Sequence, residues 1–415
     1  MQENILAAEY IIKESIAAVL PDAAVKRALE RRTFDRPPIL VAIGKAAWRM
    51  AKAAYDKLEG NILRGVVITK YEHSEGPIGP LEIYEAGHPV PDENGVAATR
   101  RALEIVSGLS SEDTVIFLVS GGGSALFELP AGEATLEDIA GITRQLLACG
   151  AAIDEINTIR KRLSAVKGGR FALACQPANV LCIALSDVLG NSIETIASGP
   201  AAPDSTTCAQ TLEIVRRYAL RIPGHIEPLL HQETPKALYG VEFDISGSVD
   251  SLCRAARDAA SRLGYVANIR TTELTCEARE AGKLLANSAK NLNIEQMPYP
   301  MRFAIILGGE TVVHLKGNGK GGRNQEIALA AARDIDGLKD VCIFSLGSDG
   351  TDGPTDAAGG IVTGETAAKI RERGLSIDDA LENNDAYPVL KAVDALIMTG
   401  PTGTNVNDVS VLLIG

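Results

Sequence analysis

The chain has 415 residues, and 41 Lys and Arg stand against 53 Asp and Glu, which gives a formal net charge of −12. This acidic balance argues against a protein that holds nucleic acid by bulk charge. Hydrophobic residues make up 46% of the chain, which excludes disorder, and the 40 glycines exceed the usual ~7% without the period of three that collagen requires. We expect a globular protein of two domains, since single hydrophobic cores stop growing near about 250–300 residues.

The cysteines and the apolar runs indicate the cellular compartment in which the protein is expected. The 7 cysteines are scattered, odd in number and without a CxxC pair, and several lie in apolar runs, which is typical of reduced thiols in a cytoplasmic protein. Residues 5–12 are apolar but interrupted by Glu9, so they lack the unbroken core of a signal peptide. No stretch approaches the ~20 apolar residues of a membrane span. We expect a cytoplasmic protein with no membrane partner.

Strand-like apolar runs alternate with amphipathic helical patterns, which is typical of α/β layers around a largely parallel sheet. After an amphipathic N-terminal helix, the pattern predicts strands at 38–44, 64–70, 114–120 and 179–187, and helices from 45 and at 93–106, 135–148 and 154–166. The proline-rich stretch 222–240 marks a boundary. The sequence therefore predicts an N-terminal Rossmann-like domain over residues 1–235.

A second α/β pattern follows, and we assign it to a domain over residues 236–415. The expected elements are helices at 249–263, 277–292, from Arg323 and at 386–393, and strands at 302–307, 311–315, 341–346 and 409–414. The organisation is two α/β domains in series.

Many glycines lie in turns that follow a predicted strand, where ligands bind in open α/β sheets. Ser120-Gly-Gly-Gly-Ser124 follows an apolar strand, and Ser120, Gly121, Gly122, Gly123 and Ser124 could together cradle phosphate oxygens. A Walker A motif is absent from the sequence, so ordinary P-loop mechanics do not apply.

Gly317-Asn-Gly-Lys-Gly-Gly322 matches the dinucleotide pattern GxGxxG by letter. No acidic residue ends a second strand about 20 residues on, where a ribose hydroxyl would be held. Positive charge at Lys320 and Arg323 suits a polyphosphate better, so Gly321, Gly322 and Asn324 are expected at a nucleotide site.

Carboxylates gather in a second glycine-rich loop, which contains Asp349, Asp352 and Asp356. Their spacing fails the calcium-loop pattern, and Mg²⁺ held with substrate phosphate, or a general base, fits more readily. Asp187 ends another predicted strand. We expect Asp187 and Asp349 to be catalytic and Asp187 and Asp352 to be metal ligands, although a turn that bonds its own backbone explains one or two of the loop carboxylates equally well.

Cations complete the set of candidates. Lys45 directly follows a strand, where its ammonium could reach a phosphate, although a lysine at a helix start is more often solvated. The segment 159–170 carries five basic residues and could focus an anionic substrate. The histidines have no paired ligand spacing, so a catalytic zinc is not expected.

Eight motifs together resemble the class II glycerate kinases. They are Gly44-Lys-Ala-Ala, Gly87-His-Pro-Val-Pro-Asp, Ser120-Gly-Gly-Gly-Ser-Ala-Leu, Lys167-Gly-Gly-Arg, Leu185-Ser-Asp-Val, Ala197-Ser-Gly-Pro, Gly321-Gly-Arg-Asn-Gln-Glu and Ser348-Asp-Gly-Thr-Asp-Gly-Pro-Thr-Asp-Ala-Ala-Gly. They follow the family order over most of the chain. The resemblance implies an N-terminal α/β domain and a C-terminal MOFRL domain, and transfer of phosphate from ATP to D-glycerate with a divalent cation such as Mg²⁺, usually giving 2-phosphoglycerate.

The resemblance also implies that Lys45 and Arg323 are the active-site cations, one from each domain, so that the site is expected in the interdomain cleft. Three alternatives stay open: an NAD(P)H-dependent hydroxypyruvate reductase, a kinase that forms 3-phosphoglycerate, and a sensor that binds ATP without consuming it. The expected partners are D-glycerate and ATP, with no nucleic acid. The sequence does not fix the oligomeric state, and a homodimer is compatible with it.

Overall fold

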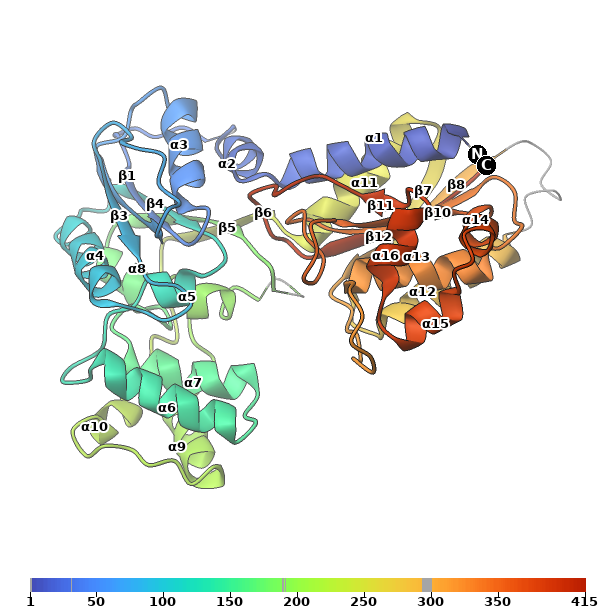
Figure 1. Ribbon diagram of the computed structural model, residues 1–415. Coiled ribbons are helices and arrows are strands. Elements are labelled where there is room, and N and C mark those ends of the chain that lie inside the picture. The colour runs from blue at the N-terminus through green and yellow to red at the C-terminus, as the bar shows by residue number, and fades with distance from the viewer. Residues whose placement is uncertain (1, 31, 189, 191, 293–300) are drawn as a thin grey trace. The chain divides into compact units, whose positions relative to one another are not determined.

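The computed structural model describes residues 2–30, 32–188, 190, 192–292 and 301–415. Contacts divide the chain into two compact units (Figure 1). The central unit consists of residues 21–246, and the terminal unit consists of residues 1–20 and 247–415. The boundary between the units falls after residue 246, whereas the prolines suggest residue 235. In addition, the first twenty residues belong to the same unit as the end of the chain.

The central unit contains a six-stranded sheet and its covering helices. Its elements are α2 (Pro21–Leu29), β1 (Ile39–Ile43), α3 (Ala47–Lys57), β2 (Arg64–Lys70), β3 (Leu81–Ala86), α4 (Glu93–Ile105), β4 (Thr114–Val119), α5 (Gly123–Leu126), α6 (Leu136–Ala148), α7 (Ile153–Leu163), α8 (Arg170–Cys175), β5 (Asn179–Leu185), η2 (Ile196–Ser198), α9 (Cys208–Arg217), α10 (Glu227–Leu230) and β6 (Val241–Gly247).

The strand order is β3-β2-β1-β4-β5-β6, and the pairs from β3 to β5 are parallel. The order runs outward in both directions from β1 and β4, so the edge between these two strands is a topological switch point. In open α/β sheets ligands bind outside the carboxyl ends of the strands at such a point. The expected Rossmann-like parallel sheet is confirmed, and its topology directs attention to the residues that follow β1 and β4.

Alternation along β1 explains how both faces of this sheet are buried. Ile39, Val41 and Ile43 lie in a core shared with α4 and α8, whereas Leu40 and Ala42 lie in a core shared with α2 and α3. A strand buried on both faces is apolar at every position, which is why β1 and β4 were recognisable in the sequence. Helices α6, α7, α9 and α10 form a separate apolar cluster within the same unit.

The terminal unit contains the second sheet. Its elements are α1 (Gln2–Val19), α11 (Val249–Arg262), β7 (Tyr265–Leu274), α12 (Ala278–Asn291), β8 (Arg302–Gly309), α13 (Arg323–Asp334), β9 (Val341–Gly347), β10 (Gly359–Thr363), α14 (Thr366–Glu372), α15 (Ile377–Glu382), α16 (Ala386–Ala392), β11 (Leu396–Ile397) and β12 (Asp408–Ile414).

This second sheet is mixed, with the order β11-β10-β9-β12-β8-β7. Among the described strands of this sheet, only β7 and β8 pair in parallel, whereas β12 is antiparallel to both β8 and β9. The expected strand at 311–315 is wrong: this segment is irregular apart from one bridge between Val312 and Glu277. Val312 and Leu315 are 47% and 80% exposed, so their apolar character does not reflect a buried strand.

Helix α1 packs in the terminal unit beside α11 and against β9 and β12. Asn4 receives a hydrogen bond from the hydroxyl of Tyr265 at 2.6 Å, and the hydroxyl of Thr404 donates to the carbonyl of Val19 at 2.9 Å. The two domains are therefore not strictly in series. The apolar stripe of α1 indicates that one face of the helix is buried, but it does not indicate which sheet the helix covers.

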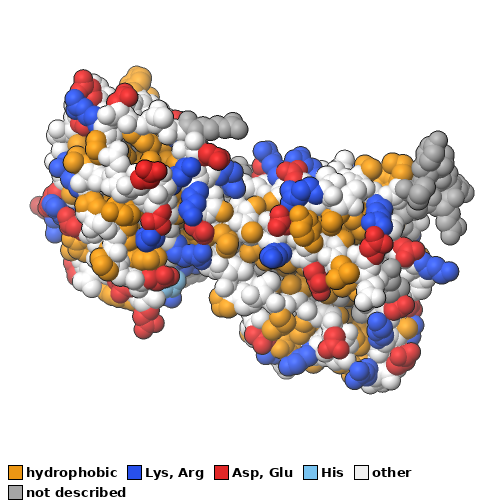
Figure 2. Space-filling model, turned by 90° about the horizontal axis from the view of Figure 1, so that it is seen from above, with side chains coloured by type: hydrophobic (Ala, Val, Ile, Leu, Met, Phe, Trp, Pro, Cys, Tyr) orange, Lys and Arg blue, Asp and Glu red, His pale blue; other side chains and the backbone are white. Residues whose placement is uncertain are grey.

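No helix among the described residues is long and apolar enough to cross a membrane. On the face drawn in Figure 2, Lys and Arg side chains are interspersed with Asp and Glu side chains.

Candidate active site

The chain leaves β1 and β4 at the switch point through two turns that touch. Gly44 has a φ of +111°, and a Cβ atom there would lie 2.4 Å from the carbonyl oxygen of Ser120, so only glycine fits. The backbone N–H of Lys45 donates to the carbonyl of Gly121 at 2.9 Å. Lys45 is therefore positioned by main-chain contacts, while its side chain is exposed.

The Lys45 side chain lies along the glycines that follow β4. A Cβ atom on Gly121 would lie 3.3 Å from Oδ2 of Asp187 and 3.8 Å from Cε of Lys45. A Cβ atom on Gly122 would lie 3.3 Å from Cγ of Lys45 and 2.9 Å from Nε2 of His88. We call Lys45, His88, Gly121, Gly122 and Asp187 the Lys45 cluster. Three segments that are distant in sequence thus bring a cation, an imidazole and a carboxylate to one pair of glycines.

His88 was not among the sequence candidates, because it was considered only as a zinc ligand. Burial lowers its pKa, and the positive charges of Lys45 and Lys70 lower it further. The imidazole is therefore neutral near pH 7 and can accept a proton. The signal that could have found it is its motif, Gly87-His-Pro-Val-Pro-Asp92, which stands immediately after β3.

The two serines of the glycine turn have partners within the protein. Ser120 is 4% exposed, and its hydroxyl donates to the carbonyl of Ile43 at 3.2 Å and accepts the N–H of Ala46 at 3.0 Å. The hydroxyl of Ser124 lies 3.0 Å from that of Ser198. Ser120 therefore ties the two turns of the switch point together, which leaves the backbone of Gly121 and Gly122 as the more accessible part of the expected cradle.

Arg323, in the terminal unit, is the first residue of α13. Its Nη2 and Nε donate to the two carboxylate oxygens of Asp408, at 3.1 and 2.5 Å, and its Nη1 donates to Glu310 at 2.7 Å. Burial opposes the charge on Arg323, but the hydrogen bonds to Asp408 and Glu310 raise its pKa. Arg323 is therefore a fixed cation, and Asp408 and Glu310 are positioning partners that the sequence analysis missed.

Asp352 holds the start of α13. Its carboxylate oxygens accept the N–H of Asn324 at 3.1 Å and the N–H of Gln325 at 2.8 Å, and the residue is 4% exposed. Burial raises the pKa of Asp352 to about 7, against the lowering effect of these backbone donors. A Cβ atom on Gly322 would lie 2.2 Å from the carboxyl carbon of Asp352, so this glycine admits the cap. Its geometry suits an N-terminal cap for the helix that carries Arg323.

Asn324 is also turned inward. Its Nδ2 donates to Asp352 at 3.3 Å and its Oδ1 accepts the hydroxyl of Ser345 at 2.6 Å, with 1% of the residue exposed. These contacts fix α13 on the sheet rather than present the amide to solvent.

Asp349 lies beside Arg323's partner. Its Oδ1 accepts the N–H of Thr351 at 2.9 Å, which forms the self-bonded turn considered from the sequence. A Cβ atom on Gly347 would lie 3.4 Å from carboxylate oxygens of both Asp349 and Asp408. A cavity of about 890 Å³ opens here, and its lining includes Asp349, Asp352, Asp408, Arg323, Gly321 and Gly322.

The GxGxxG segment serves loop packing. Cβ atoms on Gly317 and Gly319 would each lie 2.5 Å from the backbone of Asn383, and neither glycine has a positive φ. The segment does not directly follow a strand, because 311–315 is irregular. It therefore lacks the strand–turn–helix context of a dinucleotide site.

The donor set fits a divalent cation held jointly with substrate phosphate. Within the described part of the chain, no group of three His, Cys, Asp or Glu side chains could hold a metal ion by itself. Mg²⁺ is commonly bound by one or two carboxylates together with phosphate oxygens. Exposed Asp187, beside Gly121 and Lys45, fits that role, whereas both oxygens of Asp352 already accept N–H groups of α13.

Comparison with known proteins places this geometry in a family. A model described as "Domain of unknown function (DUF4147)" matches residues 7–231, and one described as "MOFRL family" matches residues 303–408. Over 404 residues, 97% of each chain, the protein is 54% identical to a D-glycerate 2-kinase from Thermotoga maritima. The chain belongs to this glycerate 2-kinase family.

Two further comparisons describe the breadth of the family. The crystal structure of a glycerate kinase from Thermotoga maritima covers 100% of both chains with a TM-score of 0.96 and 53% identity. A putative hydroxypyruvate reductase from Agrobacterium vitis is 37% identical over 423 residues, which cover 100% of this chain and 96% of the relative. The family that the sequence motifs indicated, and the fold expected from it, are confirmed.

Proposed function

We propose that the protein transfers the γ-phosphoryl group of ATP to D-glycerate and forms 2-phosphoglycerate. Membership in the glycerate 2-kinase family supports the substrates. The single structural observation that carries the proposal is the Lys45 cluster, which places the Lys45 side chain beside the half-buried Gly121 and Gly122 at the switch point of a parallel sheet.

Phosphoryl transfer requires positioning and neutralisation of charge more than covalent chemistry by the protein. The Lys45 ammonium stabilises negative charge on the oxygens of the transferring group. The backbone of Gly121 and Gly122 permits close approach of phosphate, because no Cβ atom stands in the way.

Asp187 is the residue that would hold Mg²⁺ together with substrate phosphate, and the ion would neutralise phosphate charge there. His88, neutral near pH 7 because burial and Lys45 lower its pKa, is suited to accept the proton of the glycerate hydroxyl. Asp187 is the alternative proton acceptor.

Arg323 supplies the second cation. Its guanidinium is held by Asp408 and Glu310 on the wall of the 890 Å³ cavity, where a fixed fork of donors can bind an anionic oxygen without rearrangement. Asp349 lines the same cavity and orients polar groups of the ligand.

Reduction of hydroxypyruvate is the second candidate, since two relatives from Agrobacterium vitis are named putative hydroxypyruvate reductases. The packing of Gly317 and Gly319 against Asn383 weighs against a dinucleotide at the GxGxxG segment.

Phosphorus NMR of a mixture of the protein, ATP, Mg²⁺ and D-glycerate tests the proposal. We expect loss of the γ-phosphate signal and growth of 2-phosphoglycerate, dependent on both glycerate and protein. A parallel assay follows NADH and NADPH oxidation with hydroxypyruvate. Oxidation of NADH without glycerate-dependent ATP consumption would overturn the kinase assignment, and a 3-phosphoglycerate signal would correct the position of transfer.

A further inference from the structure

The basic segment 159–170 has four cations that are satisfied inside the protein. Lys161 Nζ donates to Asp204 at 3.0 Å, and Arg162 Nη1 donates to the same carboxylate at 2.8 Å. The side chains of these three residues are 4%, 0% and 0% exposed. Their charges form a buried network that holds α7 to the loop before α9.

The other two internal cations lie at the end of the segment. Lys167 Nζ donates to the buried carboxylate of Glu128 at 2.6 Å and to the carbonyl of Phe127 at 3.0 Å. Arg170 donates to the carbonyl of Ser164 at 3.0 Å. These cations are already paired or bonded, so they are not open to an anionic ligand.

Arg160 differs from its neighbours. No carboxylate of the described residues forms an ion pair with it, and its Nη2 donates to the carbonyl of Ser124 at 3.4 Å. Its Nε is buried and has no acceptor among the described residues. The same is true of Arg162 Nε, but the other nitrogens of Arg162 pair with Asp204 and Glu233. A guanidinium with unused donors in a partly buried place is costly unless an anion completes it.

The guanidinium of Arg160 lies next to Ser124, whose hydroxyl contacts a turn with an unusual backbone conformation. The hydroxyl of Ser124 lies 3.0 Å from that of Ser198, which donates to Oδ1 of Asn157 at 3.2 Å. Ala197 and Ser198 both have left-handed φ values, 51° and 62°. Strained residues of this kind persist where the surrounding structure fixes them, and they are common at ligand sites.

Two observations show how this turn is fixed. The N–H groups of Gly168 and Gly169 donate to the carbonyls of Ser198 and Gly199 at 3.1 and 2.7 Å. The motifs Lys167-Gly-Gly-Arg and Ala197-Ser-Gly-Pro, separate in the sequence, are thus hydrogen-bonded to each other.

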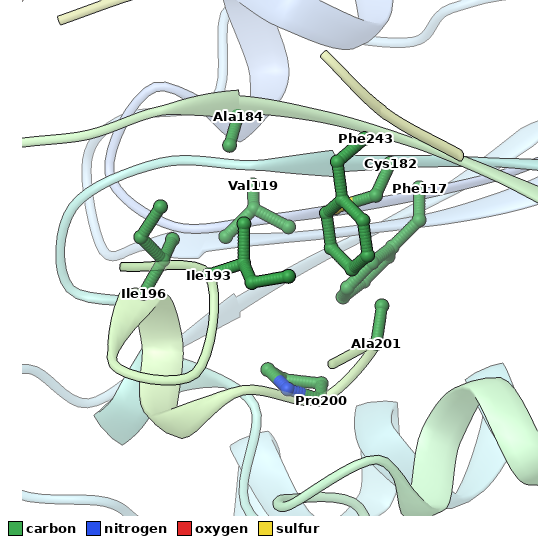
Figure 3. Close-up of a pocket in the computed structure, with 9 residues that line it drawn as sticks. All are labelled: Phe117, Val119, Cys182, Ala184, Ile193, Ile196, Pro200, Ala201 and Phe243. Atoms are coloured by element: carbon green, nitrogen blue, oxygen red, sulfur yellow. The ribbon is translucent and has the colours of Figure 1, made fainter. Parts of the chain in front are cut away.

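Apolar side chains anchor the turn from its other side. Figure 3 shows Ile196 and Pro200 facing Val119 and Ala184 of the sheet across a small apolar cavity. Its volume, about 10 Å³, is no more than a single water molecule needs, so it is a packing gap rather than a ligand site. These hydrogen bonds and apolar contacts fix the backbone of the turn that carries Ser198.

We propose that the guanidinium of Arg160 binds the carboxylate of the glycerate substrate. This inference rests on the proposed function. Gly121, Gly122 and Ser124 belong to one continuous segment, and Arg160 donates to the carbonyl of Ser124. A ligand whose phosphoryl acceptor lies at Gly121 and Gly122 can therefore direct its acid group to Arg160. The planar fork of arginine matches a carboxylate in a way that a lysine does not.

The guanidinium of Arg160 suits an anionic oxygen group, which a carboxylate or a nucleotide phosphate could supply. We assign the carboxylate, because the ammonium of Lys45 and the glycine backbone already form the phosphate cradle. Steady-state kinetics separates the two sources, since each substrate has its own KM.

The test compares Arg160→Gln, Arg160→Lys and the control Arg144→Gln, which changes an exposed arginine of α6 that pairs with Glu137. We expect Arg160→Gln to raise the KM for D-glycerate by about 10–100-fold, the loss of a charged hydrogen bond, with a smaller change in kcat and the KM for ATP within about 2-fold. Arg160→Lys should lie between it and the wild type. Arg144→Gln should match the wild type.

Guanidinium ion added to Arg160→Ala should restore part of the affinity for glycerate, which a purely structural arginine would not show. Calorimetric titration of D-glycerate, with circular dichroism to confirm folding, measures binding independently of turnover. An unchanged glycerate affinity in folded Arg160→Gln, or a raised KM for ATP alone, overturns the inference. Absence of glycerate-dependent ATP consumption by the wild type would instead refute the proposed function, and calorimetry would still decide the role of Arg160.

Discussion

Lys45 shows how a single side chain can be positioned without burying it. Its N–H donates to Gly121, and its carbonyl accepts the hydroxyl of Thr69 at 3.3 Å and lies 3.1 Å from Nδ1 of His73. The main chain is thus fixed on both sides of the residue, while the ammonium remains exposed at the switch point. Such preorganisation is how a charged group stabilises a transition state without reorganising during the reaction.

Replacement of Lys45 by Ala should lower kcat about 10²–10³-fold, because the ammonium stabilises charge that develops in the transition state. The KM values should change less. Steady-state assays would measure this, with Lys52→Ala as the control, because Lys52 lies on the adjacent α3 and forms a half-exposed ion pair with Asp56. Near-normal turnover of Lys45→Ala would remove it from the mechanism.

Replacement of Arg323 by Ala should reduce both activity and stability. The carboxylate of Asp408 is 7% exposed and would lose its partner, so we expect a loss of about 1–3 kcal/mol in the free energy of unfolding, the cost of a buried acceptor left unsatisfied. Adding Asp408→Asn to this variant should restore much of the stability, because it removes the unpaired charge. It should not restore kcat. Arg333→Ala, which breaks exposed pairs on the same helix, should cost less than about 1 kcal/mol.

If urea unfolding showed the single and double variants to be equally stable, Asp408 would not depend on Arg323 for its burial. Recovery of kcat in the double variant would show that Arg323 acts only as a structural counter-ion.

Asp352 should give the protein a stability that depends on pH. Burial raises its pKa from 3.8 to about 7, so between these values the folded state retains a proton that the unfolded state has released. The free energy of unfolding should therefore fall as the pH rises from about 4 to about 7. Asp352→Asn should flatten this part of the profile, whereas Asp378→Asn, at an exposed position, should not.

Urea unfolding at several pH values would measure the free energy of unfolding of the wild type and of the variant. Amide exchange in α13 would show whether the difference arises at this helix. Parallel profiles for wild type and Asp352→Asn would mean that the carboxylate ionises at its ordinary pKa.

At the scale of elements, the turn from β1 to α3 depends on its contact with the turn that follows β4. Gly44 and Gly76 have nearly the same φ, +111° and +114°, but a Cβ atom on Gly44 would meet Ser120, whereas one on Gly76 would have no atom within 4 Å. Comparing alanine substitutions at these two glycines therefore distinguishes the cost of the backbone conformation, which both share, from the cost of the steric clash, which only Gly44 has.

We expect Gly76→Ala to cost about 1–2 kcal/mol, from the left-handed conformation alone. Gly44→Ala should cost about 1–3 kcal/mol more, and it should lower kcat, because the two turns of the Lys45 cluster must separate. Urea unfolding and steady-state kinetics measure both effects. Equal losses in the two variants would show that the turns can move apart freely.

At the scale of the whole molecule, the first twenty residues complete the terminal unit. Ile11 of α1 is fully buried, whereas Leu6 of the same helix is 60% exposed. Contacts of α1 with α11, β9 and β12 join the beginning of the chain to its end.

Ile11→Ala should therefore destabilise the terminal unit by about 2–5 kcal/mol through the cavity that it leaves. Hydrogen exchange should show faster exchange in β9 and β12 and unchanged exchange in β1 and β4. Leu6→Ala should change stability by no more than about 0.5 kcal/mol. Faster exchange in β1 and β4 instead would mean that α1 supports the central unit.

The long-range partners of the site could not be predicted from the sequence. Asp408 and Glu310 reach Arg323 across 85 and 13 positions of the chain, and Arg160 is exceptional only because the neighbouring cations are paired elsewhere. Similarly, β3 was not predicted because its middle residues are half-buried and alternate weakly, whereas 311–315 was wrongly predicted because exposed apolar residues resemble a strand.

The sequence alone determined the family, the parallel sheet of the central unit and the glycine turns at its strand ends, because continuous apolar runs and local turn chemistry are written in neighbouring residues. Only the tertiary structure decided which sheet α1 covers, which carboxylates Arg323 holds, and that His88 and Asp187 flank the same glycines as Lys45. These facts depend on contacts between segments far apart in the chain. The excess of glycine can be read directly from the sequence, whereas the groups that surround each glycine come from distant segments and are set by the tertiary structure.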